Sequence, residues 1–229
     1  MTAEDYLEGQ VILIDKPLTW TSFQVVNKIR WIIRKEFGIK KIKVGHAGTL
    51  DPLATGLLIL CTGRFTKKIE TYQAQEKEYT GTITLGATTP SYDLETEIDQ
   101  EYDISNITPG AIVKATDRFI GDIQQRPPLF SALKKDGKRL YDYAREGKEV
   151  EIPTRTVHIS EFDITGIDLP LVNFRVVCSK GTYIRSLAYD FGKELNNGGH
   201  LSELRRTRIG SFNIKDAISI EEFTAGLAS

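Results

Sequence analysis

Cysteine and histidine are scarce in this chain of 229 residues, which contains two cysteines and three histidines. Cys61 and Cys178 each lie in an apolar stretch, and the sequence contains neither a C-x-x-C pair nor a Cys/His cluster. Structural zinc sites and redox pairs need such clusters. We therefore expect two reduced thiols in the core and no metal site.

Long hydrophobic runs are also missing. No apolar segment approaches the roughly 20 residues that cross a bilayer. The acidic start MTAEDYLEGQ resembles neither a secretory signal nor an Arg-rich transit peptide. With 40% hydrophobic and 27% charged residues, the composition is typical of a soluble globular protein. We expect a soluble, cytoplasmic protein without a membrane partner, folded as one domain over residues 1–229.

Neither sign of charge is in large excess, because the chain contains 30 basic and 31 acidic residues. The net charge of -1 argues weakly against a nucleic-acid partner, but the two signs are segregated along the chain. Acidic residues gather at 91–103. If the basic segments converge, they form a positive face that suits RNA, whereas each one alone is more often a solvated surface. These segments are 28–43, 64–68, 134–139 and 204–208.

Hydrophobic periodicity predicts strands and helices that alternate without a strict βαβ rhythm. This alternation favours an α+β fold with a mixed central sheet. The segment 124–152 has paired prolines and a basic turn, which favours a functional loop over a piece of core. The main elements we predict are a strand before Pro17, a helix over 22–37 capped by Thr21 or Ser22, a buried strand in 57–63, a helix beginning at Pro109 with Thr108 as its cap, and a helix over 182–195 capped by Thr182.

Asp51 is the first candidate for chemistry, in the stretch GHAGTLDPLATGLLIL at 45–60. A plain alternative is that Asp51 caps a helix beginning at Pro52 or only starts a turn, which Asp does readily. Its neighbours favour a ligand site, because glycines allow a close backbone approach and His46 and Thr49 supply polar groups. The glycines are Gly45, Gly48 and Gly56.

Arg185 and Tyr79 are further candidates. A lone arginine on a helix is usually solvated, but a carboxylate that must stay ionised away from water needs a cation beside it. Asp51 with Arg185, near Lys180 and Tyr183, would form such a pair. Tyr79 on a predicted strand either packs in the core or stacks on a base.

Six blocks in order resemble the TruB family of tRNA pseudouridine synthases: IDKPLTWTSF, GHAGTLDPLATGLLILCTG, KEYTGTITLG, QRPPLFSALKKDGKRLYDYAREG, VVCSKGTYIRSLAYDFG and HLSELRRTRIGSF. They cover the chain from Ile12 to Phe212, and six ordered blocks are far more specific than one motif. The resemblance implies the pseudouridine synthase fold, with a mainly antiparallel central sheet flanked by helices.

The resemblance also implies an enzyme that isomerises uridine 55 in the T loop of tRNA without cofactor or metal. The base is flipped out, because stacking hides both the bond to be broken and the ring atom to be joined. Asp51 would be the essential carboxylate, whether it attacks the sugar, attacks the base or takes a ribose proton. Arg185 would keep it ionised, and Tyr79 would pack on the base.

Substrate contacts follow from the same resemblance. Lys16 would support the active-site loop, and His46 would fill the place of the flipped uridine. The insertion at 124–152 would be a mobile, RNA-gripping element. Gly45, Thr49 and Tyr183 would line the site, and the phosphate contacts would be Arg126, Lys134, Lys135, Lys138, Arg139 and Arg205, although Arg205 could equally be a structural ion-pair partner.

The blocks leave about seventeen residues after Phe212, too few for the C-terminal PUA module of many family members. We therefore expect recognition to centre on the T stem-loop, by a monomer without an obligate protein partner. The alternatives are a related synthase with another RNA target and a non-catalytic RNA-binding or remodelling protein.

Overall fold

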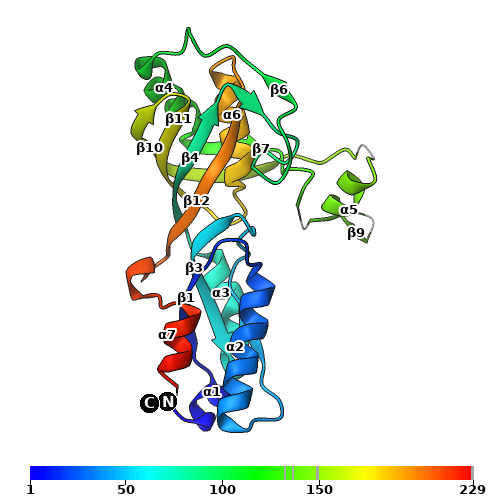
Figure 1. The fold of residues 1–229 in the computed structure, drawn as a ribbon, viewed down its shortest axis with the longest axis vertical. Helices are drawn as coiled ribbons and strands as arrows, with labels where there is room; N and C mark the ends of the chain where they lie inside the picture. Colours follow the sequence, from blue (N-terminus) through cyan, green and yellow to red (C-terminus); the bar gives the residue numbers. More distant parts are fainter. Residues whose placement is uncertain (132, 136, 148–149, 228–229) are drawn as a thin grey trace. The chain divides into compact units, whose positions relative to one another are not determined.

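The computed structural model describes residues 1–131, 133–135, 137–147 and 150–227 (Figure 1). The chain divides into two compact units. The first unit consists of Met1–Tyr79 and Leu204–Ser229, and the second consists of Thr80–Glu203. Two strands, β4 (Lys77–Leu85) and β12 (Gly199–Ile209), contribute residues to both units.

The first unit contains a mixed sheet. Strand β3 (Ala54–Thr62) pairs antiparallel with β1 (Val11–Lys16) and with β2 (Val44–His46). Residues 204–206 of β12 run parallel to residues 54–56 of β3, and β13 (Phe212–Asn213) pairs with the end of β12. The helices of this unit are α1 (Ala3–Glu8), α2 (Ser22–Phe37), α3 (Ile69–Ala74) and α7 (Ile220–Ala225), with 3-10 turns at Gly63–Lys68 and Ile214–Asp216.

Strand β3 is buried on both faces, which explains its continuous apolar run. Leu58 and Leu60 pack into a core with residues of α1, α2, β1 and α7. Leu57, Ile59 and Cys61 point to the opposite face and pack in a second cluster. Successive strand side chains alternate between faces, so a strand covered on both sides needs apolar residues at every position. The predicted buried strand is confirmed.

Helix α2 has the bounds that its capping residues predict. Thr21 and Gln24 form a capping box at its start, and Gly38 ends it in the left-handed conformation at φ 63°. The buried residues Val25, Ile29 and Ile33 form one face of the helix. The helix predicted over 22–37 is confirmed, with Thr21 as its cap.

The second unit is built on strands in the order β12-β4-β11-β10-β7, with β10 (Arg155–Asp168) antiparallel to both β11 (Leu171–Cys178) and β7 (Gly121–Gln125). Four phenylalanines pack edge-on or tilted in its core: Phe119, Phe162, Phe174 and Phe191. Its remaining elements are β5 (Ala87–Thr88), β6 (Gln100–Glu101), α4 (Pro109–Ala115), a 3-10 turn at Thr116–Phe119, β8 (Lys134–Lys135), β9 (Lys138–Arg139), α5 (Leu140–Arg145) and α6 (Ile184–Glu194).

The start of α6 differs from the prediction. Tyr183, not Thr182, occupies the N-cap position. The Thr182 hydroxyl instead donates to the carbonyl of Ser179 at 3.0 Å and stabilises the turn before the helix. The prediction for α4 is confirmed, since Thr108 caps it and Pro109 is its first residue. The α+β class with a mixed, mainly antiparallel sheet is confirmed as well. None of the described helices is long and apolar enough to span a bilayer.

Candidate functional site

Hydrogen bonds from the buried side chain of Arg206, which is only 1% exposed, hold the turn that carries Asp51. The Arg206 guanidinium donates to the carbonyls of Leu57 at 2.8 Å, Gly48 at 3.1 Å and Thr49 at 3.4 Å. Burying a charge is costly unless it is fully hydrogen-bonded. These three bonds therefore stabilise the cation and fix both ends of the segment around Asp51.

A second buried cation, Lys16, fixes the same turn from β1. Its ammonium is fully buried and donates to the carbonyls of Trp20 at 2.6 Å, Pro17 at 2.9 Å and Pro52 at 3.5 Å. Burial lowers the pKa of Lys16 to about 8; the charge of Asp51 raises it and that of Arg206 lowers it. The ammonium thus contacts the residue after Asp51 and places positive charge near its carboxylate.

The two neighbours of Asp51 are held by hydrogen bonds while Asp51 itself is partly exposed. Buried Ser22 accepts from the amide of Leu50 at 2.9 Å and donates to its carbonyl at 3.2 Å. The Pro52 carbonyl also accepts from the amide of Thr19 at 2.8 Å. Residues 51–53 form a turn that leads into β3, and the amide of Ala54 donates to the carbonyl of Asp51 at 3.1 Å. No helix begins at Pro52, so the helix-cap alternative is wrong, whereas the expectation that Asp51 starts a turn is confirmed.

His46 ends β2, close to this turn. Burial lowers its pKa below the ordinary value, and the positive charge of Arg206 lowers it further. The imidazole is therefore neutral at pH 7 and suited to packing against a base more than to attracting phosphate. Gly45 precedes it, at a position where a Cβ atom would lie 2.7 Å from the side chain of Ile69. Thr49 is exposed on the turn.

Arg205 is engaged with Asp15 in a bidentate ion pair. Its two terminal nitrogens lie 2.6 and 3.0 Å from the carboxylate oxygens, and one of them also donates to the Thr55 hydroxyl at 3.3 Å. Arg205 is therefore a structural ion-pair partner, which was one of the two roles that the sequence left open for it. The contact of Arg205 with RNA remains a prediction.

In the second unit, Arg185 is 4% exposed on α6. Its Nη1 donates to the carbonyls of Phe130 at 2.9 Å and Ser91 at 3.2 Å, and its Nε lies 3.5 Å from the carboxylate of Asp93. Asp93 is itself 6% exposed. Arg185 is thus a buried ion-pair partner and not a solvated surface residue.

Tyr183 is positioned by Gln125, whose side chain is fully buried. The Gln125 amide group accepts from the backbone N–H of Tyr183 at 2.7 Å and donates to its carbonyl at 3.0 Å. The guanidinium of Arg155 lies 4.5 Å from the centre of the Tyr183 ring. Three residues after Tyr183, the hydroxyl of Ser186 donates to the carbonyl of exposed Arg126 at 2.7 Å.

The basic residues of the insertion form a short hairpin of β8 and β9 followed by α5. Lys138 forms an ion pair with Glu146, and Lys135 donates to the carbonyl of Glu151 at 2.8 Å. Arg139 is exposed and donates to the Tyr141 hydroxyl at 2.9 Å. The Lys134 side chain and residues 132, 136 and 148–149 lie outside the described part of the chain.

Sequence reasoning missed three buried polar side chains that organise these sites: Arg206, Asp93 and Gln125. Strand alternation could have signalled Arg206, because it must face opposite to Arg205. Asp51 and buried Tyr79 belong to the first unit and Arg185 to the second. The pairing of Asp51 with Arg185 therefore remains a prediction. Within the described residues, no cluster of three or more His, Cys, Asp or Glu could hold a metal ion.

Two family models together match most of the chain. Residues 34–184 match the model described as TruB family pseudouridylate synthase (N terminal domain). Residues 185–228 match the model described as tRNA pseudouridylate synthase B C-terminal domain. The junction between them falls at the start of α6.

Several similar proteins carry the name tRNA pseudouridine synthase B. The one from Flavobacterium johnsoniae is 61% identical over 228 residues, covering 99% of this chain and 100% of the relative. The one from Phocaeicola vulgatus is 56% identical, covering 96% and 93%. The one from Chlorobaculum tepidum is 49% identical, covering 93% and 89%.

Among solved structures, a chain of a Cbf5-Nop10-Gar1 complex matches with a TM-score of 0.73 and 30% identity over 98% of this chain. A chain of an H/ACA RNP bound to a substrate RNA containing 2'-deoxyuridine matches with a TM-score of 0.69 and 28% identity over 96%. The present chain spans 56% and 53% of those two chains, about half their length.

Proposed function

The chain belongs to the TruB family of pseudouridine synthases, and on that premise we propose that it converts uridine 55 in the T loop of tRNA to pseudouridine, with Asp51 as the essential carboxylate. The reaction breaks the bond from N1 of uracil to the ribose and forms one from C5. C5 loses a proton and N1 gains one, so the atoms balance without a cofactor or a metal ion.

The observation that carries this proposal is the support of the Asp51 turn. Two buried cations, Lys16 and Arg206, donate to carbonyls on both sides of Asp51. Ser22 fixes the residue before it. A catalytic carboxylate has to be held within a fraction of an ångström of its reacting atom, and buried hydrogen bonds to its neighbours achieve this without covering the carboxylate.

The fixed Asp51 turn would also suit the binding of a uridine that has been flipped out of its stack. Extruding uridine from its stack costs a few kcal/mol, which contacts in the pocket must offset. Tyr79 would pack on the uracil, and neutral His46 would occupy the place it leaves. Arg185 would keep Asp51 ionised on substrate binding, with Asp93 maintaining its orientation. The basic insertion would bind tRNA phosphates, and we place this activity in a cytoplasmic monomer without an obligate partner.

The test is isomerisation of a tRNA transcript that carries tritium at C5 of its uridines. Wild-type protein should release tritium from position 55 only, whereas Asp51→Asn should release none and still bind the RNA. Asp163→Asn is the matched control, because Asp163 is exposed on β10 and pairs only at the surface with Arg175.

Three outcomes would change the proposal. Turnover that survives in Asp51→Asn would exclude Asp51 as the essential carboxylate. Release from a different uridine or a different RNA would indicate a related synthase with another target. Tight binding of tRNA by the wild type without any release of tritium would favour the non-catalytic RNA-binding protein.

A further inference from the structure

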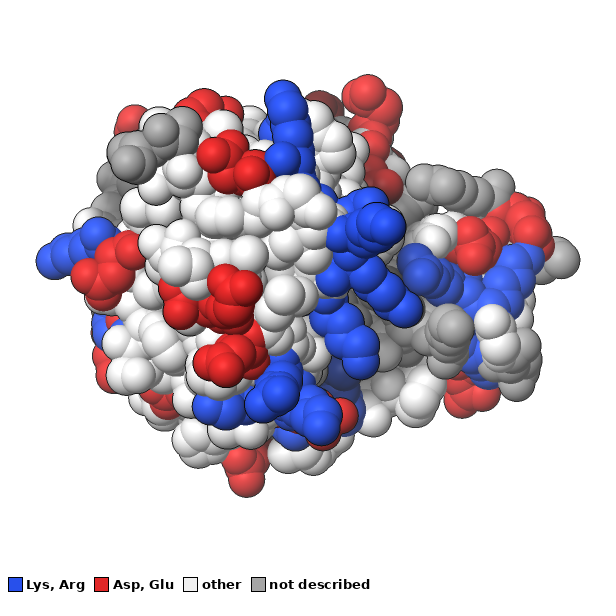
Figure 2. Space-filling model, turned by 90° about the horizontal axis from the view of Figure 1, so that it is seen from below, with Lys and Arg blue, Asp and Glu red and all other residues white. Residues whose placement is uncertain are grey.

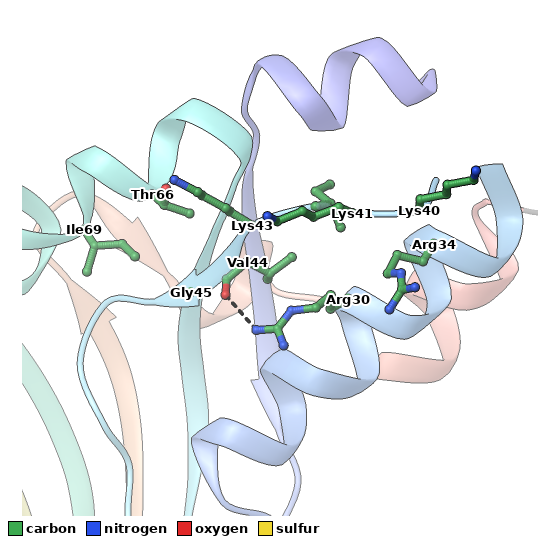
Figure 3. Close-up of a pocket in the computed structure, with 10 residues that line it drawn as sticks. Arg30, Arg34, Lys40, Lys41, Lys43, Val44, Gly45, Thr66 and Ile69 are labelled. Atoms are coloured by element: carbon green, nitrogen blue, oxygen red, sulfur yellow. Dashed lines mark hydrogen bonds between the residues drawn. The ribbon is translucent and has the colours of Figure 1, made fainter. Parts of the chain in front are cut away.

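A basic groove of about 480 Å³ lies in the first unit, between helix α2 and the segment that leads into β2. Figure 3 shows Arg30 and Arg34 projecting from α2 and Lys43 extending toward Thr66. In Figure 2, Lys and Arg side chains gather in a band on one face of the molecule. The charged residues that line the groove are all basic: Arg30, Arg34, Lys40, Lys41 and Lys43.

The two arginines build the walls of the groove. Arg30 donates to the carbonyl of Val44 at 3.2 Å, shown as the dashed line in Figure 3. Arg34 donates to the carbonyl of Ile39 at 3.3 Å. Both guanidinium groups thus fix the segment 39–44 against α2. The backbone on the other side is also fixed, because the amide of Gly63 donates to the carbonyl of Lys43 at 3.0 Å.

The three lysines of the groove differ from its two arginines, because their side chains do not hold the backbone in place. Lys40, Lys41 and Lys43 are exposed, and in the described part of the chain none of their ammonium groups has an ion-pair or hydrogen-bond partner. Other cations of the same unit are paired: Arg205 with Asp15, and Arg208 with Glu76. The residues that line the groove include no Asp or Glu to offset the charge of these lysines. An anionic ligand would supply the missing counter-charge.

We propose that this groove binds backbone phosphates of the substrate RNA, at a place separate from the uridine pocket. The assignment rests on the proposed function and extends it, because Gly45 lines the groove while the next residues of the chain are His46 and the Asp51 turn. An RNA strand that delivers its uridine to Asp51 therefore has phosphates close to the path of β2. Lysine ammonium groups suit such contacts, which set affinity and register and carry no sequence information.

The lining of the groove favours RNA over an acidic membrane. Surfaces that bind lipid place exposed apolar side chains beside the basic ones, to enter the acyl region. Here Ile42 and Val44 are buried, at 7% exposure each, and Ile69 is partly buried in the cluster around β3. The lining of the groove therefore presents cations and no exposed apolar side chain, and the exposed Trp31 of α2 is not part of that lining but lies under the ammonium groups of Lys28 and Lys35.

The test compares three variants in RNA binding and turnover. The groove variant is Lys41→Gln/Lys43→Gln. The charge-retaining variant is Lys41→Arg/Lys43→Arg, and the matched control is Lys114→Gln/Lys215→Gln, which removes two exposed lysines outside the groove. Binding of a tRNA transcript and of its isolated T stem-loop is measured from 50 to 200 mM salt, together with tritium release at saturating RNA.

We expect the groove variant to bind tRNA roughly tenfold more weakly and its salt slope to fall by about 1 for each lysine removed. Its turnover at saturating RNA should equal that of the wild type. The charge-retaining variant and the control should bind like the wild type. A groove variant with unchanged affinity and salt slope would overturn the proposal, and so would an equal loss in the control.

Two further results separate this proposal from the proposed function. If the wild type binds tRNA through the lysines but releases no tritium, the groove is supported and the proposed activity fails. If the groove variant loses binding to vesicles of phosphatidylserine and phosphatidylcholine while keeping its affinity for RNA, the groove is a membrane site and the proposal is overturned.

Discussion

The guanidinium Nε of Arg185 lies 3.5 Å from the carboxylate of Asp93, and both side chains are more than nine-tenths buried. The arginine also donates to the carbonyls of Ser91 and Phe130. One oxygen of Asp93 accepts from the backbone N–H of Glu95 at 3.0 Å, which orients the carboxylate. The pair therefore fixes the orientation of an arginine that the family resemblance assigns to catalysis.

Asp93→Asn should destabilise the protein by roughly 3–5 kcal/mol, because it leaves the buried charge of Arg185 uncompensated. Its tritium release should also fall, since the guanidinium loses its fixed orientation. Urea unfolding and turnover measure the two effects. The control is Asp163→Asn at an exposed ion pair, which should cost less than about 1 kcal/mol. Equal stability of the two variants would contradict the role of Asp93.

Arg206→Met should destabilise the first unit and slow turnover, because the guanidinium holds the backbone of the turn that carries Asp51. Methionine fills a similar volume but leaves the carbonyls of Gly48, Thr49 and Leu57 without their donor. An unsatisfied buried acceptor costs about 1–3 kcal/mol. Unfolding by urea and tritium release would report both losses, and a variant with normal turnover would show that the turn keeps its geometry without the guanidinium.

The pH dependence of stability should carry a signature of Lys16. Burial lowers its pKa in the folded protein to about 8 from the ordinary value of 10.5. The unfolded chain therefore binds more protons at this group between pH 8 and 10.5, and stability from Lys16 rises with pH across this window. A shift of this size corresponds to at most about 3 kcal/mol.

Comparison with Lys16→Met isolates the contribution of Lys16, because the other titrating groups contribute almost equally to the stability of both proteins. The free energy of unfolding of the wild type minus that of Lys16→Met should rise from pH 8 to 10 and stay flat from pH 6 to 7. Urea titrations at each pH measure it. A difference that falls as the pH rises would mean that the ammonium is held in its charged form by the carbonyls of Pro17, Trp20 and Pro52.

Local signals explain which parts of the fold could be predicted. The bounds of α2 follow from the Thr21 cap and Gly38, and the apolar run of β3 follows from burial on both faces. Helices α1 and α3 contain six residues each, too few to show a periodicity. The segment at 200–212 contains no local signal that decides between helix and strand, and the pairing of β12 with β3 makes it a strand.

The candidate site could be predicted only in part, because some of its contacts join segments that are far apart in the sequence. Asp51 stands out because turn residues surround it in the sequence. Arg206 does not, because the carbonyl of Gly48 that it binds lies 158 residues away. The carbonyl of Ser91 lies 94 residues from Arg185. Contacts of this range depend on which strands pair, and residue patterns within one segment contain no such information.

Gly56 shows how closely the two strands that hold the site approach each other. It lies opposite Lys16 in β1 and Arg206 in β12, and its φ of +103° is one that side-chain-bearing residues rarely adopt. A Cβ atom there would lie 2.3 Å from the backbone oxygen of Arg206. The sequence suggested that this glycine makes room for a ligand, whereas the structure shows that it makes room for the neighbouring strand.

Gly56→Ala should therefore destabilise the protein by more than 1 kcal/mol and reduce turnover, because β12 must move and carry the Arg206 guanidinium away from the Asp51 turn. Gly110→Ala is the matched control, since Gly110 lies in α4 with no atom within 4 Å of the added Cβ. That change should be neutral or stabilise by up to about 1 kcal/mol. If both substitutions left stability and tritium release unchanged, the approach of β3 to β12 could not be what positions Arg206.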